Sequence, residues 1–506
     1  MSTLANAKDT VTMRDSTNAS GATQDTKVRE VIAAQVLTPD LCVIGAGSGG
    51  LSVAAAAAQL GVSVVLIEKH LMGGDCLNSG CVPSKALIAA GKHAHAMRSG
   101  RMFGIRPVEP EIDSRGVRDH VHSVIATIAP NDSVERFTGL GVQVIQAAGY
   151  FVDPSTVAAG EYRIRARRFI VATGSSAGVP PIAGLKDTPF YTNETVFDIA
   201  EPIGHLIVIG AGPIGMELAQ AHRRLGAKVT VLEGRTALAK DDPELTAVAL
   251  KRLKQEGVQI FENVSINLVS GVRGAIVVAI QDGGETRSIE GTHLLVAAGR
   301  KPNVADLGLD AGKVVFGPQG IKVDAKLKTS NKRVMAIGDV TGGLQFTHVA
   351  NYHAGIVIRR ALFRLPAKVN NDLVPWVTYT DPEIANVGLT EAQARERGIA
   401  VNVYRWPYSE NDRAQAERET DGLVKVVCDK RGRILGAGIV GAHAGELIQM
   451  WSLALSQGLK ISAMTQWISP YPSFSEINKR AAFGYLAGKG SSPVVRKLLS
   501  FLRKFG

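Results

Sequence analysis

Residues 40–69 read DLCVIGAGSGGLSVAAAAAQLGVSVVLIEK and contain the local pattern that decides the fold. The apolar run at 41–44 predicts a short strand, and the closely spaced glycines after it predict a tight turn. The small residues that follow predict a helix, and 62–69 predicts a second strand. This order predicts a β-α-β unit of an α/β protein.

Three glycines in this turn have the spacing of a dinucleotide-binding loop: Gly45, Gly47 and Gly50. Glycines so placed let the backbone turn and approach a pyrophosphate at the N-terminus of the helix. Glu68 ends the second predicted strand, where a carboxylate can bind a ribose hydroxyl. We therefore interpret the unit as a dinucleotide site rather than as glycines kept only for packing.

The same order recurs in residues 205–234, HLIVIGAGPIGMELAQAHRRLGAKVTVLEG, so we expect two dinucleotide cofactors. The glycines of this second loop are Gly210, Gly212 and Gly215. Glu233 ends the second strand of the unit, and a carboxylate there binds a ribose 2′-hydroxyl and repels a 2′-phosphate. NADH is therefore favoured over NADPH, although Arg235 weakens that preference.

Length and composition set wider limits. A chain of 506 residues predicts about three domains, and the alternating pattern at 422–441 predicts an antiparallel sheet in the last of them. The net charge of +11 suits nucleic acid, an anionic membrane or phosphate-bearing cofactors, but no nucleic-acid motif is present. Four cysteines cannot form a disulfide scaffold, and no signal peptide or long apolar run is present. We expect a cytoplasmic protein without a membrane span and without a metal site.

The strongest chemical signal is GGDCLNSGCVPSK, residues 73–85. Five residues of regular helix would hold Cys76 and Cys81 about 8 to 9 Å apart at Cα, beyond disulfide reach, so the helix must be interrupted between them. Cys81 precedes Pro83 at a predicted helix N-terminus, which stabilises a thiolate. The pair is interpreted as redox-active, whereas Cys42 and Cys428 lie in predicted strands and are interpreted as packing residues.

Several further segments occur in the same order along residues 38–490: VATGS (171–175), GAGPIGMELA (210–219), VAAGRKPN (296–303), AIGDV (336–340) and GAHAGEL (441–447). Together with the cysteine segment they resemble the class I pyridine nucleotide-disulfide oxidoreductases, a family that includes dihydrolipoamide dehydrogenase, glutathione reductase and mercuric reductase. The resemblance implies FAD in the first unit and a nicotinamide dinucleotide in the second. It also implies a homodimer.

Roles for single residues follow from the resemblance. Cys76 would be the interchange thiol that attacks the acceptor, and Cys81 the thiol beside the flavin. Lys85 would lie near the flavin and pair with Glu217, and Asp339 would bind the FAD ribitol. The residues implied to line the FAD are Gly149, Thr173, Gly174 and Ser175, and those implied beside the nicotinamide cofactor are Gly299 and Arg300.

The implied architecture is two Rossmann-like dinucleotide-binding domains plus a C-terminal α+β dimerisation domain. We expect the FAD-binding domain at 37–190 and 316–372, the NAD(P)-binding domain at 191–315 and the dimerisation domain at 373–490. The polar stretch 1–36 is expected to be a disordered extension. The basic, amphipathic stretch 491–506 is expected to be a surface helix that packs on its own domain or frays, with weak membrane-surface contact as the alternative.

One segment departs from the family pattern. Disulfide-handling members have a C-terminal His-Pro segment followed by Glu, which gives an acid/base pair to the partner subunit's interchange thiol. Here the segment reads SPYPSFSE (469–476), with Tyr471 at the His position and Glu476 at the Glu position. A phenol with a pKa near ~10 is a poor proton acceptor at neutral pH.

Three interpretations follow. The first is an NAD(P)H-dependent disulfide reductase like dihydrolipoamide dehydrogenase with a modified acid/base group. The second is a reductase like mercuric reductase that passes electrons to a metal ion, quinone or other non-thiol acceptor. Mercuric reductases also have a tyrosine at this position, but the cysteine pair that they carry near the C-terminus is absent after Cys428. The third is a non-catalytic flavoprotein subunit, which an intact cysteine pair disfavours.

Overall fold

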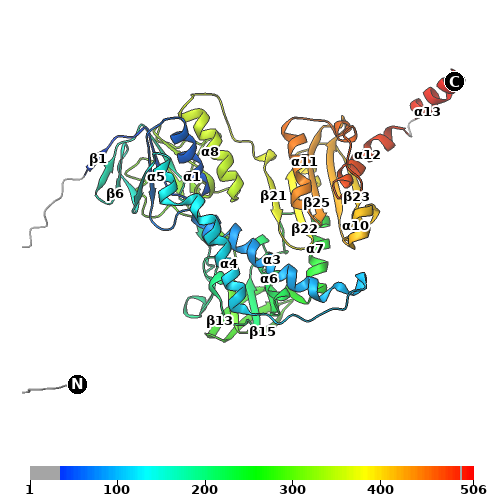
Figure 1. Cartoon of the computed structure of the whole chain (residues 1–506), viewed down its shortest axis with the longest axis horizontal. Coiled ribbons are helices and arrows are strands. Elements are labelled where there is room, and N and C mark those ends of the chain that lie inside the picture. The colour runs from blue at the N-terminus through cyan, green and yellow to red at the C-terminus, as the bar shows by residue number, and fades with distance from the viewer. Residues whose placement is uncertain (1–34, 491–492, 506) are drawn as a thin grey trace, which may run out of the picture.

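The computed structural model describes residues 35–490 and 493–505, and Figure 1 shows how their helices and strands are arranged. The described strands form seven sheets, of which three are named the first, second and third sheet in chain order. The first sheet is parallel, with strand order β20-β8-β2-β3-β4. Its strands are β2 (Leu41–Ile44), β3 (Val64–Glu68), β4 (Gln143–Gln146), β8 (Arg168–Val171) and β20 (Val334–Ala336). All four residues of β2 are buried, as expected for the central strand of a sheet covered on both faces.

Helices cover one face of this sheet and a second small sheet covers the other. Leu41 and Val43 pack against α1 (Ser48–Gln59) and α8 (Thr347–Ala361), while Cys42 packs on the opposite side. The small sheet has the order β1-β7-β6-β5. Its strands are β1 (Gln35–Leu37), β5 (Gly149–Asp153), β6 (Thr156–Ala159) and β7 (Tyr162–Ile164).

The predicted boundary of the disordered extension at residue 36 is wrong. β1 begins at Gln35 and pairs in parallel with β7, because its backbone completes the edge of the small sheet. The remainder of the extension lies outside the described residues.

The second dinucleotide unit has its own parallel sheet, with order β12-β11-β10-β16. Its strands are β10 (His205–Ile209), β11 (Lys228–Leu232), β12 (Val258–Phe261) and β16 (His293–Val296). Its helices are α6 (Pro213–Arg224) and α7 (Pro243–Gln255), and a three-stranded antiparallel sheet is formed by β13 (Ser265–Val272), β14 (Ala275–Asp282) and β15 (Glu285–Gly291). The two β-α-β units predicted from the sequence are therefore both present.

The third sheet is antiparallel, with order β21-β22-β25-β24-β23. Its strands are β21 (Pro375–Thr378), β22 (Glu383–Gly388), β23 (Val401–Pro407), β24 (Leu423–Asp429) and β25 (Ile434–Gly441). Its helices are α9 (Glu391–Glu396), α10 (Asp412–Glu417), α11 (Ala444–Ser456) and α12 (Glu476–Gly490). The fold class, α/β with two Rossmann-like units and a C-terminal α+β domain, is thus confirmed.

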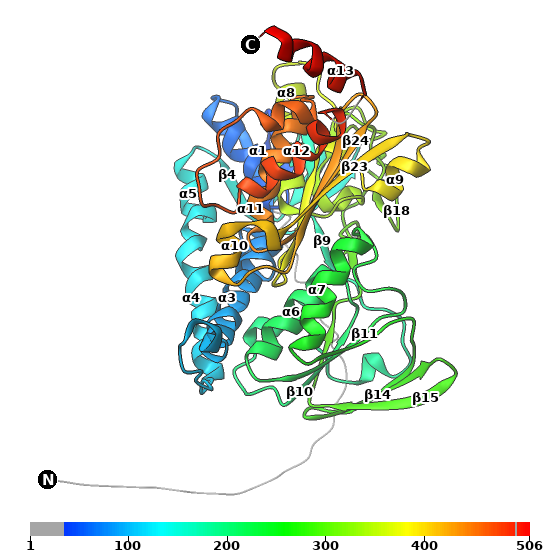
Figure 2. The same cartoon turned by 90° about the vertical axis from the view of Figure 1, so that its right-hand side faces the viewer.

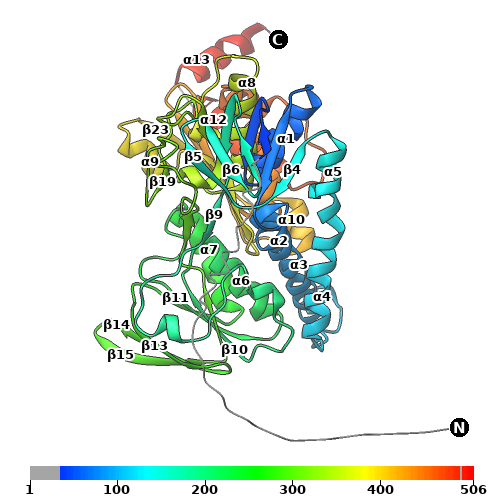
Figure 3. The ribbon, with the colours of Figure 1, turned by 90° about the vertical axis from the view of Figure 1, so that its left-hand side faces the viewer.

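Helices connect the first two units at the level of the cysteine segment. The four helices after β3 are α2 (Gly74–Asn78), α3 (Cys81–Arg98), α4 (Ser114–Ile128) and α5 (Val134–Gly139). Figure 3 shows α3 and α4 side by side, with α6 of the second unit close to α3. At Gly91 of α3, a Cβ would lie 3.1 Å from the carbonyl oxygen of Ala221 in α6. This close approach holds the cysteine segment against the second unit.

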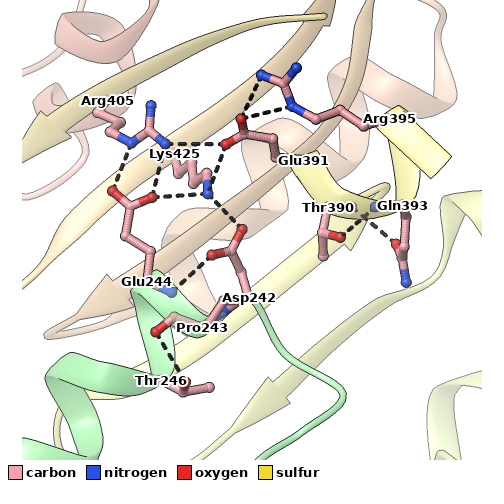
Figure 4. Close-up of polar contacts among 10 residues, drawn as sticks. All are labelled: Asp242, Pro243, Glu244, Thr246, Thr390, Glu391, Gln393, Arg395, Arg405 and Lys425. Carbon is pink, nitrogen blue, oxygen red and sulfur yellow. Dashed lines mark hydrogen bonds and ion pairs between the residues drawn. The ribbon is translucent and has the colours of Figure 1, made fainter. Parts of the chain in front are cut away.

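An ion cluster fastens the second unit to the third sheet (Figure 4). The ammonium of Lys425, only 7% exposed in its side chain, lies 2.8 Å from Asp242, 2.9 Å from Glu244 and 3.2 Å from Glu391. Arg405 bonds both Glu244 and Glu391. Asp242 also caps α7, so the cluster fixes the start of that helix against β23 and β24.

The basic C-terminal stretch forms α13 (Pro493–Leu502) and a following 3-10 turn, Arg503–Phe505. None of the described side chains of α13 is buried. α13 is therefore a surface helix whose described side chains are not buried against the domain before it. Figures 1 and 2 both place α13 beyond the end of α12, at the end of the molecule opposite β13–β15.

Candidate active site

Cys76 and Cys81 lie on either side of a helix break. α2 ends at Asn78 and α3 begins at Cys81, and Gly80 between them has φ −124° and ψ −114°, outside the helical region. The break brings the two side chains into hydrogen-bonding contact, which an uninterrupted helix would prevent. Both are free cysteines in this structure.

The two thiols have opposite tendencies to ionise. The pKa of Cys81 is lowered to about 6, first by the hydrogen bond from Cys76 and then by Thr347 and Lys85. Sγ of Cys81 lies 3.3 Å from Oγ1 of Thr347. The hydrogen bond to Cys81 and burial raise the pKa of Cys76. At neutral pH the pair therefore holds a thiolate at Cys81 and a thiol at Cys76.

Lys85 stands one helical turn after Cys81 and pairs across the two units. Its ammonium lies 2.8 Å from Oε2 of Glu217, whose side chain is 7% exposed. The other carboxylate oxygen of Glu217 accepts a hydrogen bond of 2.9 Å from the backbone N–H of Tyr379. The Tyr379 ring also lies 4.2 Å from the ammonium, a cation–π contact. The Glu217 carboxylate and the Tyr379 ring thus fix one positive charge beside the cysteine pair.

Arg300 lies against residues of the first unit. Its guanidinium is 3.0 Å from Asp75, the residue before Cys76, and donates to the hydroxyl and carbonyl oxygens of Ser175 at 2.8 Å each. Ser175 in turn donates to Asp339 at 2.6 Å, and burial raises the pKa of Asp339. These contacts place Arg300 between the cysteine loop and the residues implied for FAD, rather than in contact with the second glycine loop. The antiparallel pairing of β9 (Ser175–Ala177) with β17 (Arg300–Pro302) explains this position.

One long cleft joins most of the residues singled out from the sequence. Its volume is about 2030 Å³, and it runs from the first glycine loop past the cysteine pair to the edge of the third sheet. The predicted residues that line it are Gly45, Gly47, Glu68, Cys76, Cys81, Lys85, Gly149, Thr173, Gly174, Ser175, Glu217, Gly299, Arg300 and Asp339. Outside it lie Gly50, the second-unit residues Gly210, Gly212, Gly215 and Glu233, and also Tyr471 and Glu476.

The first glycine loop fits a dinucleotide. A Cβ on Gly50 would lie 1.9 Å from the carbonyl oxygen of Gly45, so this glycine is needed for close packing of helix on strand. Gly45 has φ +105°, a conformation that favours glycine. At Gly47 a Cβ would have no atom nearer than 3.9 Å, and it faces the cleft. That open space is where a pyrophosphate fits, and FAD can be held there with Glu68 at its ribose.

The second loop repeats this geometry. A Cβ on Gly215 would lie 2.0 Å from the carbonyl oxygen of Gly210, and Gly210 has φ +106°. A Cβ on Gly212 would have no atom within 4 Å. Oε2 of Glu233 accepts a 2.8 Å hydrogen bond from the backbone N–H of Ala211. Glu68 is held in the same way by Ala46 at 2.6 Å. Both carboxylates are thus fixed at the strand ends where a ribose would lie.

Tyr471 and Glu476 do not form a pair with each other. The Tyr471 hydroxyl donates to Oδ2 of Asp412 at 2.7 Å, and this hydrogen bond raises the pKa of the phenol. Glu476 instead pairs with Arg480, one turn later in α12. Tyr471 is 70% exposed and lies outside the cleft of its own chain. Within one chain, Cys76 therefore has no contact with this segment.

Sequence reasoning missed five residues of the site. They are Asp75, Asn193, Thr347, Tyr379 and Asp412. Asp75 could have been singled out from its place beside Cys76 in GGDC. The others come from distant segments without a motif of their own, and only the fold brings them together.

The remaining thiols and histidines have structural surroundings. Cys42 and Cys428 are fully buried, and burial raises the pKa of both thiols. His353 accepts from the backbone of Gly338, and the His443 ring packs against Phe474. Among residues 35–490 and 493–505, no three His, Cys, Asp or Glu side chains gather closely enough to hold a metal ion.

The fold and the site together define a class of protein: a two-dinucleotide oxidoreductase with a cysteine pair between its two cofactor units. Residues 39–354 match the family model described as pyridine nucleotide-disulphide oxidoreductase, and residues 374–482 match the dimerisation domain of the same family. The chain belongs to the pyridine nucleotide-disulphide oxidoreductase family. This family uses FAD and NAD(P)H.

Relatives with two different activities are similar to this chain. A mercuric reductase of Bacillus cereus is 35% identical over 449 residues, covering 88% of this chain and 71% of that protein. A dihydrolipoyl dehydrogenase of Geobacillus stearothermophilus is 34% identical over 463 residues, covering 89% and 97%. The Cu(II) complex of the HOCl-induced flavoprotein disulfide reductase RclA from Escherichia coli superimposes with a TM-score of 0.79 at 27% identity, covering 88% and 99%.

The chain is thus a flavoprotein oxidoreductase of this family, and its relatives leave the acceptor open. In the part of the chain that the structure describes, every helix is too short or too polar to cross a bilayer.

Proposed function

We propose that the chain is an NADH-dependent FAD enzyme that reduces a disulfide through Cys76 and Cys81, with a cysteine pair and cofactor units like those of the dihydrolipoyl dehydrogenases to which it is similar. The observation that carries this proposal is the position of the pair, which lines the cleft that begins at the first glycine loop, with the Lys85–Glu217 ion pair beside it. Cys81 is held as a thiolate beside Lys85, while Cys76 remains a thiol whose proton is donated to Cys81. In such a pair, one sulfur exchanges electrons with the flavin and the other attacks the acceptor.

The residues at the end of the cleft near the first glycine loop would hold the FAD. Asp339 and Glu68 are placed for its ribitol and ribose hydroxyls, and Thr173 and Gly174 line the path between them. FAD held there would supply two-electron transfer from NADH to the Cys76–Cys81 disulfide. The Lys85 ammonium, fixed by Glu217, stabilises negative charge next to Cys81 throughout.

In the acceptor step, the reduced cysteine pair supplies both electrons and the first of the two protons. Cys76 attacks one sulfur of the acceptor disulfide while its proton moves to Cys81, and the first acceptor sulfur leaves with that proton from Cys81. The Cys81 thiolate then attacks the Cys76 sulfur of the mixed disulfide. The Cys76–Cys81 disulfide re-forms, and the second acceptor sulfur leaves and takes a proton from water. Two electrons pass from the pair to the acceptor.

A homodimer would complete the acceptor site. The chain carries the family's dimerisation domain, and Tyr471 is exposed rather than packed in its own chain. We place the partner subunit's Tyr471 and Glu476 opposite Cys76. There the phenol, whose pKa is raised by its hydrogen bond to Asp412, would stay protonated, would turn its single O–H from Asp412 to a sulfur and would not act as a base.

That same phenol favours a second candidate function, the reduction of a metal ion, quinone or other non-thiol acceptor. A non-thiol acceptor needs no histidine to take the proton from an attacking thiol. Similarity to a mercuric reductase and to a reductase solved with Cu(II) supports this candidate. The absence of cysteines after Cys428 counts against delivery of a soft metal by a C-terminal pair.

The nucleotide and compartment belong to the same proposal. Glu233, fixed by Ala211 and by the backbone N–H of Arg235 at 2.9 Å, favours NADH, because a carboxylate repels a 2′-phosphate. We expect kcat/KM to be higher for NADH than for NADPH, and Glu233→Ser to reduce that ratio.

Dependence on NADH is compatible with the cytoplasm as the working compartment. Contact of α13 with a membrane surface is a separate proposal.

An acceptor panel tests the function. NADH oxidation is measured with lipoamide, glutathione disulfide, Hg(II), Cu(II) and a quinone, on the wild type, Tyr471→His and the control Tyr471→Phe. We expect Tyr471→His to raise lipoamide turnover by about 100-fold, the lower end of what a positioned base contributes. Fast lipoamide turnover by the wild type that histidine does not increase would show that no base is missing. Turnover confined to Hg(II), Cu(II) or the quinone would support the second candidate.

A further inference from the structure

We propose that α13 with its following turn is an interfacial helix that attaches the enzyme to an anionic lipid bilayer. The apolar side chains of this segment are exposed to a degree that is unusual for a folded protein. Their exposed fractions are 76% for Val494, 53% for Leu498, 49% for Leu499, 55% for Phe501, 49% for Leu502 and 73% for Phe505. The inference does not depend on the identity of the acceptor.

The residues of α13 separate cleanly around the helix axis. At about 100° per residue, its apolar side chains occupy a continuous arc of about 160°. They are Val494, Val495, Leu498, Leu499, Phe501 and Leu502. The opposite arc holds only Pro493, Arg496, Lys497 and Ser500. Phe505 extends the apolar side, since its ring packs edge-on against Phe501 at 5.0 Å between centroids.

The charge on this segment has one sign. Residues 493–505 contain Arg496, Lys497, Arg503 and Lys504 and no acidic residue. Lys497 flanks one edge of the apolar arc, and Arg503 continues the helix at the other edge. Long basic side chains at the edges can bury their methylene stems while their charged ends reach lipid phosphates. Such a basic segment with an apolar face matches the surface of an anionic bilayer.

A second copy of α13 fits this face less well. Pairing two apolar arcs would bring the flanking Lys497 and Arg503 of each helix toward those of the other, and residues 493–505 offer no carboxylate to neutralise them. The ten residues of the helix span about 15 Å, which is too short to cross a membrane. The helix can therefore lie in the surface of a bilayer but cannot span it. Its place at the far end of the molecule leaves it accessible (Figure 2).

Vesicle co-sedimentation with the FAD-loaded full chain tests this proposal. Vesicles are made of phosphatidylcholine alone or of phosphatidylcholine mixed with phosphatidylglycerol. We expect at least about tenfold stronger binding to the mixed vesicles, and weaker binding as salt is raised. The face variant Leu498→Glu/Leu502→Glu should lose binding by about tenfold or more.

A control is Val272→Glu, which places a carboxylate at an apolar site on β13 that is more exposed than Leu498 and Leu502 and lies far from α13. It should bind as the wild type does, and all three proteins should keep the same NADH-driven activity with a soluble acceptor. Equal binding of wild type and face variant, or equal binding to the two kinds of vesicle, would overturn the proposal. So would a smaller sedimentation mass of the lipid-free face variant, because the face would then be covered by another copy. No vesicle binding by the wild type would point to a protein partner and also overturn it.

Discussion

At the scale of single residues, the charge on Cys81 depends on neighbours that can be removed one at a time. Thr347 is the simplest of them, because its hydroxyl contacts Sγ of Cys81 at 3.3 Å and lies outside the cysteine segment. Loss of a donor to a thiolate raises the thiol pKa. We expect Thr347→Val to move the Cys81 pKa upward from about 6 by roughly one unit.

A pH titration of the two-electron-reduced enzyme measures the direction of the Cys81 pKa shift. Above the Cys81 pKa the sulfur is a thiolate and its charge-transfer absorbance with the flavin is present, and below that pKa the absorbance is lost. The midpoint should therefore shift to higher pH in Thr347→Val and stay unchanged in Thr127→Val, an exposed threonine on α4. A wild-type midpoint well above neutral pH would contradict the assignment of Cys81 as the stabilised thiolate.

The sequence predicted the site unevenly, and distance along the chain explains why. Gly45, Cys76 and Cys81 could be predicted, because short segments define the turn and the helix break that they need. Pairing of Lys85 with Glu217 could be expected only through the family resemblance. Contacts such as Asp75 with Arg300 or Tyr471 with Asp412 join segments far apart in the chain. No local pattern marks residues of that kind.

At the scale of elements, two glycines of the second loop are expected to have different roles within one β-α-β unit. A Cβ on Gly215 would lie 2.0 Å from the Gly210 carbonyl oxygen, whereas a Cβ on Gly212 meets nothing within 4 Å. We expect Gly215→Ala to lower the stability of the second unit by about 1–3 kcal/mol, because α6 must move away from β10. Gly212→Ala should fold normally and weaken NADH binding, since its methyl group would occupy the pyrophosphate space.

Thermal unfolding and NADH titration of both variants measure the two effects separately. FAD content should be unchanged in each, because the first loop is untouched. Equal melting temperatures for the two alanine variants would mean that the close packing at Gly215 can relax. These glycines also show why the two units could be predicted: strand, loop and helix are contiguous, so the pattern is complete within about 30 residues.

The ion cluster between the second unit and the third sheet is an element contact that no local pattern could predict. Lys425 is buried and shared by Asp242, Glu244 and Glu391 (Figure 4). We expect Lys425→Met to cost about 3–5 kcal/mol of unfolding free energy, because it leaves a buried carboxylate at Asp242 without its cation. Denaturant unfolding measures this loss.

Arg395→Met is the matched control for Lys425→Met. Arg395 also pairs with Glu391, but its side chain is 60% exposed, so its removal should cost about 1 kcal/mol or less. Similar losses for the two variants would show that the cluster is solvated and contributes little to holding the domains together.

At the scale of the whole molecule, the cleft of one chain joins the first glycine loop to the cysteine pair, whereas the acceptor site that we propose needs a second chain. The cleft leads from the first glycine loop to Cys76, while Tyr471 lies outside it and exposed. If the partner subunit supplies Tyr471, two defective subunits can form one intact site. A heterodimer of a Cys76→Ala chain and a Tyr471→Ala chain has Cys76 on the second chain facing the Tyr471 of the first. We expect it to recover about half of the wild-type turnover, since one of two sites is restored.

Co-expression with two different affinity tags isolates this heterodimer, and NADH oxidation with the preferred acceptor measures it. Each parental homodimer should have low acceptor turnover, because every site in it lacks one of the two residues. NADH reduction of the flavin should persist in the Cys76→Ala homodimer, since hydride transfer precedes the thiol step. Activity of the heterodimer no higher than the mean of its parents would place both residues in independent sites of single chains. Recovery would instead make the dimer, and not the single chain, the unit that carries out the reaction.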